Sequence, residues 1–433
     1  MLSVGFLFTF FLFCCKIVFG DAMKKIVIIG GGAAGLMAAC RAGEKYGGSA
    51  EIIIVEKNDR PARKVMITGK GRCNVTNNCN TDTLISNVPK NGKFLFSAFS
   101  EFNSSDTMKF FESMGVPLKT ERGNRVFPVS DKACDIVDAL VKGVKQNGAH
   151  IINGRAVSVI AENGCVNGVK LENGEIINAD GVIIATGGMS YPLTGSTGDG
   201  YKIAEKLGHT VTELKPSLVP LTVHEGFCER LSGLSLKNII LSVFEEGKKK
   251  PVFSELGEML FTHFGISGPL VLSASAHMRK IGQKQYTAVI DLKPGLTLNQ
   301  LNVRILRDFD EAKNRDFANS LDRLLPKSLI PVIITLSGIP RDEKVNQISR
   351  EQRERLCSVI KNMTLHITGT RPIEEAIITG GGISVKEINP STMESKIIKG
   401  LYFAGEIMDV DAYTGGFNLQ IAFSTGFTAG NNI

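Results

Sequence analysis

The residues best suited to chemistry in this sequence are three closely spaced glycines and an acid that follows them. The glycines come directly after the β-branched run 26–29, and the acid closes a second such run 21 residues after the last glycine. Glycines at this spacing permit a tight turn, a close approach of a pyrophosphate and close packing of a helix on a strand. These residues are Gly30, Gly32, Gly35 and Glu56.

The elements that position them form a β-α-β unit over residues 24–57. After Gly35 the stretch LMAACRAGEKY continues as a helix, whose N-terminus offers free N–H groups to phosphate oxygens. Ala33 and Ala34, between the glycines, are expected to contact the cofactor as well. The pattern predicts a dinucleotide site, and the acid favours the free ribose hydroxyl of FAD or NAD over NADP.

The C-terminal end of the chain has a similar order of strand, glycine, acid and helix. A short apolar strand at 401–404 ends in Gly405 and Glu406, and a glycine-rich turn then opens a helix. Flavin enzymes with this opening use an acid here to hold the ribityl chain, and the helix dipole favours negative charge on reduced flavin. A second strand, acid and helix entry at the C-terminal end therefore favours FAD over NAD. The helix residues that we expect to face the flavin are Gly416, Asn418 and Leu419.

A third block lies between the two ends. Residues 182–188 form a strand that ends in Thr186, Gly187 and Gly188, and residues 156–180 carry two Asn-Gly hairpin signals. A three-stranded meander and this strand complete the FAD domain of two-dinucleotide-fold flavoproteins, in which Val157 would lie near the adenine.

Three motifs make a resemblance specific. The stretch 71–77 (GRCNVTN), the stretch 195–200 (GSTGDG) and the block 400–420 resemble the BaiN-like flavoproteins, also called aminoacetone-oxidase-like FAD-binding enzymes. The resemblance covers residues 23–430 and implies an α/β fold. It consists of a Rossmann-type FAD-binding domain built from both chain ends and an inserted β-barrel-like domain with a small helical insert. The family reduces activated C=C bonds or oxidises small amines, and most members lack an assigned substrate.

The stretch 66–77 allows three interpretations: a glycosylation sequon at Asn74, a redox pair of Cys73 with Cys79, or a cofactor loop. A loop packed on a cofactor cannot accept a glycan. Flavin disulfide reductases space their cysteines more closely than these two, so we expect Cys73 to be a small buried residue beside the flavin. The cofactor-side residues expected in this part of the chain are Lys57, Lys64, Arg72, Cys73 and Asn74.

The middle of the chain changes character after residue 209. We expect strands at 218–223, 237–245, 251–253, 258–262 and 286–292, and then a charged, Leu-rich helical segment. The expected domains are an extension outside the fold (1–22), the FAD-binding domain (23–209 and 380–433), the barrel-like domain (210–296 and 362–379) and the helical insert (297–361).

Composition narrows the function class. The net charge of +7 is mild and dispersed, so we expect no nucleic-acid partner, and the nine scattered cysteines and six isolated histidines indicate no metal site. Residues 23–433 carry no membrane signal. Residues 1–22 are interpreted as an upstream extension of a cytoplasmic enzyme, with an exported or membrane-anchored form as the alternative. The oligomeric state is left open.

These observations predict an FAD-dependent oxidoreductase. NAD(P)H, as a transient co-substrate, would give hydride to the flavin, which would pass it to an activated C=C bond or another small organic acceptor. The alternatives are an oxygen-using oxidase of a small amine and, less favoured, a flavoprotein that binds or modifies RNA. The candidate proton donors are His263, Tyr413, Asp409 and Asp411.

Overall fold

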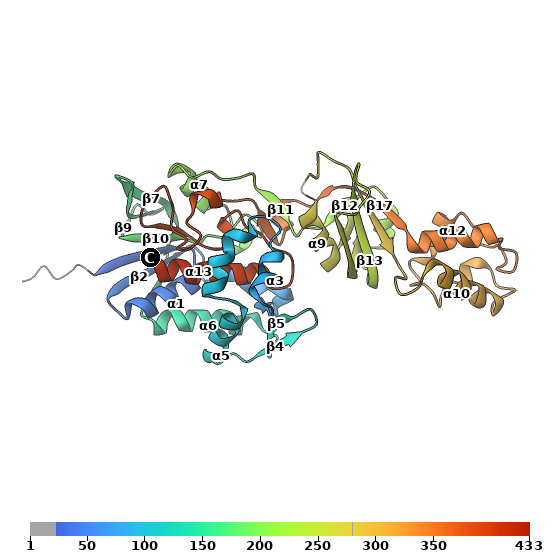
Figure 1. The fold of residues 1–433 in the computed structure, drawn as a ribbon, viewed down its shortest axis with the longest axis horizontal. Coiled ribbons are helices and arrows are strands. Elements are labelled where there is room, and N and C mark those ends of the chain that lie inside the picture. Colours follow the sequence, from blue (N-terminus) through green and yellow to red (C-terminus); the bar gives the residue numbers. More distant parts are fainter. Residues whose placement is uncertain (1–22, 279) are drawn as a thin grey trace, which may run out of the picture.

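The computed structural model describes residues 23–278 and 280–433, so the extension expected at residues 1–22 lies outside the described residues. Figure 1 shows an elongated molecule with three parts in a row: a large α/β part built from both chain ends, a β-barrel in the middle, and a group of helices at the far end.

A parallel sheet forms the centre of the α/β part. In the described chain its strands are β1 (Lys24–Ile29), β2 (Ala50–Glu56), β6 (His150–Asn153), β10 (Gly181–Ile184) and β19 (Leu401–Phe403), in the order β19-β10-β1-β2-β6. The register places Val27 beside Ile53 on one side and beside Val182 on the other. Strands buried on both faces read as continuous apolar runs, which explains their sequences. The sheet confirms a Rossmann-type unit built from both chain ends.

Two helices from opposite ends of the chain pack backbone to backbone. They are α1 (Ala33–Tyr46), which follows β1, and α13 (Phe417–Asn432) at the C-terminus. A Cβ on Gly426 would overlap the carbonyl oxygen of Ala34, and one on Gly430 would overlap that of Ala38. The glycines of α13 therefore allow its close contact with α1, which lies near it in Figure 1.

Further elements surround this sheet. The expected meander is present as β7, β8 and β9, and a small sheet of β3, β5 and β4 follows the loop that contains Cys73. The bounds are β3 (Thr76–Asn77), β4 (Leu118–Glu121), β5 (Arg125–Pro128), β7 (Ala156–Glu162), β8 (Cys165–Leu171), β9 (Ile176–Asn178), α2 (Arg63–Ile67), α3 (Thr81–Ser86), α4 (Phe96–Glu101), α5 (Ser104–Ser113), α6 (Ala133–Gln146) and α7 (Asp199–Lys206).

A closed barrel follows, with strand order β12-β15-β14-β13-β16-β17 among the described residues. The bounds are β12 (Leu221–Val223), β13 (Ser235–Glu245), β14 (Phe253–Thr262), β15 (Gly265–Ser267), β16 (Tyr286–Asp291) and β17 (Met363–Thr370), and helices α8 (Phe227–Arg230) and α9 (Pro269–His277) accompany them. The expected strand 258–262 begins earlier, at Phe253, because β14 pairs with β13 from Phe253 to Leu260 across one bulge; residues 251 and 252 lie outside it. The expected strand 218–223 is shorter, because Leu218 has a positive φ of 53°.

The barrel is joined to the α/β part by two antiparallel strands, β11 (Lys215–Ser217) and β18 (Ile378–Gly380). Between β16 and β17 the chain leaves the barrel as α10 (Leu298–Asp310), α11 (Ile330–Ser337) and α12 (Arg350–Lys361), which lie at the far end of the molecule in Figure 1. These helices pack on each other through the barrel-side core. The domain boundaries given above stay predictions.

A buried histidine makes the stability of the α/β part depend on pH. Burial lowers the pKa of His209, whose Nε2 lies 2.8 Å from Ser395 Oγ and whose ring packs edge-on against Phe403. Its Nδ1 is buried and has no hydrogen-bond partner among the described residues. As the pH falls below about 6.5, the unfolded chain therefore takes up the proton first, and the free energy of unfolding decreases.

We expect His209→Gln to flatten this pH dependence. Urea unfolding at pH 7.5 and pH 5.5 measures the difference in the free energy of unfolding for each protein. The exposed His150 provides the control, since His150→Gln should keep the wild-type difference. An unchanged pH dependence in His209→Gln would show that another group titrates in this window.

Candidate functional site

A cavity of about 920 Å³ lies in the described part of the chain. It opens at the carboxyl ends of β1, β2, β10 and β19, which is where ligands bind in open α/β sheets. From there it extends to the barrel side, where Leu218, Leu272 and Ile377 line it. Its volume lies within the roughly 300–1,000 Å³ of small-molecule and cofactor sites.

Most of the expected cofactor residues line this one cavity. Those that line it are Gly30, Gly32, Ala33, Ala34, Glu56, Lys57, Lys64, Arg72, Asn74, Thr186, Gly187, Gly405, Glu406, Gly416, Asn418 and Leu419. Those outside the lining are Gly35, Cys73, Val157 and Gly188.

The glycine loop after β1 gives each glycine a different task. Gly30 has a φ of 104°, and a Cβ there would lie 2.6 Å from the Ala185 carbonyl oxygen. Gly35 lies beneath the loop, where a Cβ would overlap the carbonyl oxygen of Gly30. A Cβ on Gly32 would meet only Ala185 O, at 4.0 Å, and Gly32 lines the cavity. Gly32 is therefore the glycine that leaves room for a ligand rather than for the protein.

The acid that ends β2 is held in place before any ligand arrives. Glu56 is buried and lines the cavity; its Oε2 accepts from Gly31 N (2.7 Å), and its Oε1 accepts from Asn58 N (2.8 Å). Carboxylates with two lone pairs per oxygen accept further hydrogen bonds, so Glu56 can also receive ribose hydroxyls.

A charged cluster lines the same cavity beyond Glu56. Asp199, the first residue of α7, pairs with Lys57 (2.8 Å) and with Arg155 (2.9 Å). Burial raises the pKa of Asp199, but hydrogen bonds from Arg155 and Lys57 outweigh it and hold that pKa well below its usual range. Val157 is half-buried nearby, and its neighbours Arg155 and Ala156 line the cavity instead.

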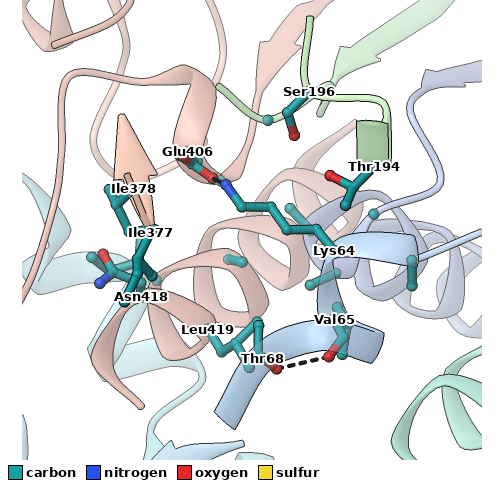
Figure 2. Close-up of a pocket in the computed structure, with 18 of the residues that line it drawn as sticks. Lys64, Val65, Thr68, Thr194, Ser196, Ile377, Ile378, Glu406, Asn418 and Leu419 are labelled. Carbon is teal, nitrogen blue, oxygen red and sulfur yellow. Dashed lines mark hydrogen bonds and ion pairs between the residues drawn. The ribbon is translucent and has the colours of Figure 1, made fainter. Parts of the chain in front are cut away.

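Figure 2 shows the centre of the cavity, where Lys64 of α2 extends toward Glu406 after β19. Lys64 Nζ lies 2.7 Å from Glu406 Oε2 and donates to Ser190 Oγ at 2.7 Å. Glu406 Oε1 accepts from Thr379 N (2.9 Å). Gly188 lies behind this carboxylate, because a Cβ there would come within 2.8 Å of Oε1. The expected ribityl-side acid thus lies in the cavity with a cation beside it.

This ion pair gives a testable prediction. Lys64→Met should lower the free energy of unfolding of the cofactor-stripped protein by about 1–3 kcal/mol, because the Glu406 carboxylate, with 15% side-chain exposure, loses its cation. Lys70→Met, an exposed lysine on the same cavity rim, is the control and should change it by less than about 0.5 kcal/mol. Urea unfolding measures both, and equal effects would contradict a stabilising pair.

The loop of residues 66–77 packs under the N-terminus of α13. The Asn74 amide, in the orientation that satisfies its neighbours, donates to Val126 O (3.2 Å) and accepts from Gly416 N (2.9 Å). Cys73 is fully buried, and burial raises its pKa to about 12, so its thiol is inert at neutral pH. Cys73 and Cys79 are both free thiols. Arg72 lines the cavity while it pairs with Glu121 and Asp131.

The α13 N-terminus also faces the cavity. Gly416 has a φ of 98°, and a Cβ there would overlap the backbone of Thr76. No side chain caps α13 or α1, so their first N–H groups can bind a ligand. Asn418, in the first turn of α13, accepts from Ala412 N (2.8 Å) and donates to Ala412 O (2.8 Å).

The candidate proton donors lie in different places. Tyr413 lines the cavity. His263 is exposed in the turn between β14 and β15, with its ring against Phe264, and lies outside the lining. Asp409 is buried and pairs with Lys90, and Asp411 is buried and accepts from Ser217 Oγ (2.7 Å); neither lines the cavity.

Several lining residues were not expected from the sequence. The chain brings Leu218, Glu258, Leu272, Ile377 and Ile378 to the cavity from the barrel and its connections, and no motif marks them. Asn58, Thr194 and Ser196 also line it. Ser196 belongs to the glycine-rich stretch 195–200 that the sequence singled out, which follows the turn at 192–194 and leads into α7.

The residues fit a flavin dinucleotide. The glycine loop leaves space at Gly32, Glu56 lies at the end of β2, and two uncapped helix N-termini open on one cavity. The buried Thr186 hydroxyl, at the end of β10, has no partner within the described chain. Across residues 23–278 and 280–433, no group of three His, Cys, Asp or Glu is placed to hold a metal ion, and no helix is long and apolar enough to cross a membrane.

Comparisons with known proteins agree with this fold. The model of the HI0933-like protein Rossmann domain family matches residues 24–432. A 3-dehydro-bile acid delta(4,6)-reductase of Clostridium scindens is 30% identical, covering 94% of this chain and 98% of its own length. Ribosomal RNA dihydrouridine synthases are 31% identical in Escherichia coli (94% of this chain, 97% of theirs) and 33% identical in Haemophilus influenzae (94% and 98%).

Among solved structures, GidA of Aquifex aeolicus is similar with a TM-score of 0.40 and 14% identity, covering 94% of this chain and 62% of that one. The family match spans nearly the whole described chain, and it confirms the BaiN-like resemblance. The chain therefore belongs to the HI0933-like Rossmann domain family, and it is an enzyme of the flavin oxidoreductase class.

Proposed function

We propose that this chain is an FAD-dependent reductase that uses NADH or NADPH to saturate a C=C bond conjugated with a carbonyl group in a small organic acceptor. The observation that carries the proposal is the single cavity, which joins the dinucleotide end at Gly32 and Glu56 to an apolar compartment between the sheet and the barrel. Leu218, Leu272 and Ile377 line that compartment, where an acceptor can be shielded from water.

Different residues would bind different parts of FAD. The α1 N-terminus would receive the pyrophosphate, and Glu56 the adenosine ribose. Lys64 and Glu406 would contact the ribityl side, and the α13 N-terminus would place a partial positive charge beside the ring system. When bound, the flavin supplies hydride transfer. Tyr413, at the cavity wall, would supply the proton that the acceptor carbon needs.

The names of the relatives support this reaction class. A delta(4,6)-reductase of a 3-dehydro-bile acid and a dihydrouridine synthase both saturate C=C bonds in rings that carry a carbonyl group. All seven cysteines in the described chain are free, which fits the cytoplasmic location that we include in the proposal.

Uridine in RNA is a second candidate acceptor, because two relatives at 31% and 33% identity are named ribosomal RNA dihydrouridine synthases. An RNA acceptor would contradict our expectation that the protein has no nucleic-acid partner. A uridine would have to leave its stack to reach the cavity. Arg63, Lys70 and Arg125, at the cavity wall, are cations that could meet phosphates.

The test is anaerobic stopped-flow mixing of the purified yellow protein with NADH or NADPH, followed by cyclohex-2-enone or a uridine-containing ribosomal RNA transcript. We expect bleaching near 450 nm by at least one nucleotide and its reversal by the enone. Reversal by the transcript alone would favour the RNA acceptor. A protein that neither nucleotide bleaches, but that a small amine bleaches, would instead be an amine oxidase.

A further inference from the structure

Side chains of helix α9 in the barrel contact the loop that precedes α13. Ser273 Oγ lies 3.0 Å from Thr414 Oγ1. One turn later on α9, the ring of His277 stacks on the ring of Tyr413, with centroids 4.6 Å apart and planes at 12°. His277 Nδ1 lies 3.4 Å from Tyr413 Oη. Two side chains on one face of α9 therefore contact two consecutive residues that line the cavity.

The position of the Tyr413 side chain is fixed from several directions. Its backbone N–H donates to Asn87 O (3.0 Å), and its carbonyl accepts from Asn418 Nδ2 (3.4 Å). Behind His277 lies Phe253 of the barrel, with ring centroids 5.3 Å apart. The imidazole is thus held between a barrel side chain and the phenol, and it transmits the position of the barrel to the cavity wall.

Few other side chains in the cavity lining are suited to donate a proton. Among its described lining residues there is no His and no Cys, and Tyr413 is the one phenol. Of the three lysines in that lining, Lys57 pairs with Asp199 and Lys64 pairs with Glu406, while Lys70 is exposed at the rim. A phenol beside an imidazole is therefore the best-placed acid in this cavity.

We propose that His277 is a positioning residue that holds the Tyr413 phenol for proton transfer to the acceptor; this inference rests on the proposed function. The acceptor C=C bond takes a hydride, derived from the reduced nicotinamide, on one carbon and the Tyr413 proton on the other. The C=C π bond and the phenol O–H bond break as two C–H bonds form. His277 Nδ1, as the N–H tautomer, faces the phenolate oxygen that results, which then regains a proton from solvent.

Two substitutions distinguish the contribution of the ring stack from the contribution of His277 Nδ1. His277→Phe keeps a ring against Tyr413 but removes Nδ1, and His277→Ala removes both. In the FAD-loaded enzyme we expect His277→Phe to lower the limiting rate of enone-driven reoxidation about 10-fold, with the apparent Kd for cyclohex-2-enone unchanged. Flavin reduction by the nicotinamide should stay within about twofold, because that step needs no proton from Tyr413.

A double-mutant cycle shows whether His277 acts through Tyr413. In a Tyr413→Phe background, His277→Phe should have no further effect on the reoxidation rate. His224→Phe, at an exposed barrel histidine outside the cavity lining, is the matched control and should keep wild-type rates. Additive losses would overturn the inference, and so would a change confined to the apparent Kd.

Amide hydrogen exchange provides a readout that does not depend on turnover. We expect His277→Ala to increase exchange in the segment 412–416 and His277→Phe to leave it near the wild-type level, since the stack remains. Wild-type reoxidation rates in His277→Phe would overturn the role of Nδ1. A wild-type enzyme that the nucleotide bleaches but the enone does not reoxidise would instead contradict the proposed function on which the inference rests.

Discussion

Gly32→Val is expected to yield a folded, colourless protein. Gly32 has an ordinary φ of −80° with extended ψ, and a Cβ there meets only the Ala185 carbonyl oxygen at 4.0 Å. A valine therefore fits the protein itself, and the cost to the free energy of unfolding of the cofactor-free protein should be about 1 kcal/mol or less, as for a poor N-cap residue. Its methyl groups would occupy the space where the pyrophosphate approaches α1.

We expect this substitution to weaken FAD binding at least about 100-fold, or ~2.8 kcal/mol. Absorbance at 450 nm after reconstitution measures binding, and thermal unfolding without FAD measures the fold. Gly35→Val is the contrasting variant, because its Cβ would overlap the Gly30 carbonyl oxygen and should disrupt the fold itself. Wild-type FAD affinity in Gly32→Val would contradict the placement of the cofactor at this loop.

Tyr413→Phe is expected to uncouple the two halves of the catalytic cycle. The ring of this cavity-lining residue and its stack on His277 remain, while the hydroxyl is lost. Loss of a general acid typically costs 10²–10⁴ in rate, so enone-driven reoxidation should slow about 100-fold or more. Reduction by the nicotinamide should be nearly unchanged.

Stopped-flow traces of the two half-reactions measure this split directly. Asp409→Asn is the comparison among the other candidate donors. Its carboxylate is buried against Lys90 and lies outside the cavity lining, so its loss should affect the free energy of unfolding rather than reoxidation alone. A selective loss of reoxidation in Asp409→Asn, with Tyr413→Phe unaffected, would assign the acid to the aspartate.

The parts of the fold that the sequence predicted are those in which local chemistry determines the structure. Gly30 and Gly416 have positive φ and lie against neighbouring backbone, so no other residue fits and the motif is readable. The doubly buried strands of the sheet read as apolar runs for the same reason: their surroundings permit only one kind of side chain.

The barrel was harder to read. Residues 254–257 of β14 include two polar residues and a glycine, and they lie between the two expected strands. They are nevertheless paired with β13, because backbone hydrogen bonds with a neighbouring strand, rather than their side chains, hold them in the sheet.

The candidate site divides in the same way. Most residues expected beside the cofactor line the cavity, whereas its apolar barrel-side part was not expected. Leu218, Leu272 and Ile377 are ordinary apolar residues, and only the docking of the barrel on the α/β part brings them to the cavity. Likewise, nothing in the sequence relates His277 to Tyr413, which are 136 residues apart.

One measurement tests the central claim most directly: a single anaerobic turnover with product analysis by mass spectrometry. The FAD-loaded protein is first reduced with one equivalent of the nicotinamide nucleotide that bleaches it and is then mixed with cyclohex-2-enone. We predict one cyclohexanone per reoxidised flavin. A flavin that stays reduced with both the enone and the uridine-containing transcript, yet is reoxidised by oxygen after an amine has bleached it, would contradict the reductase assignment.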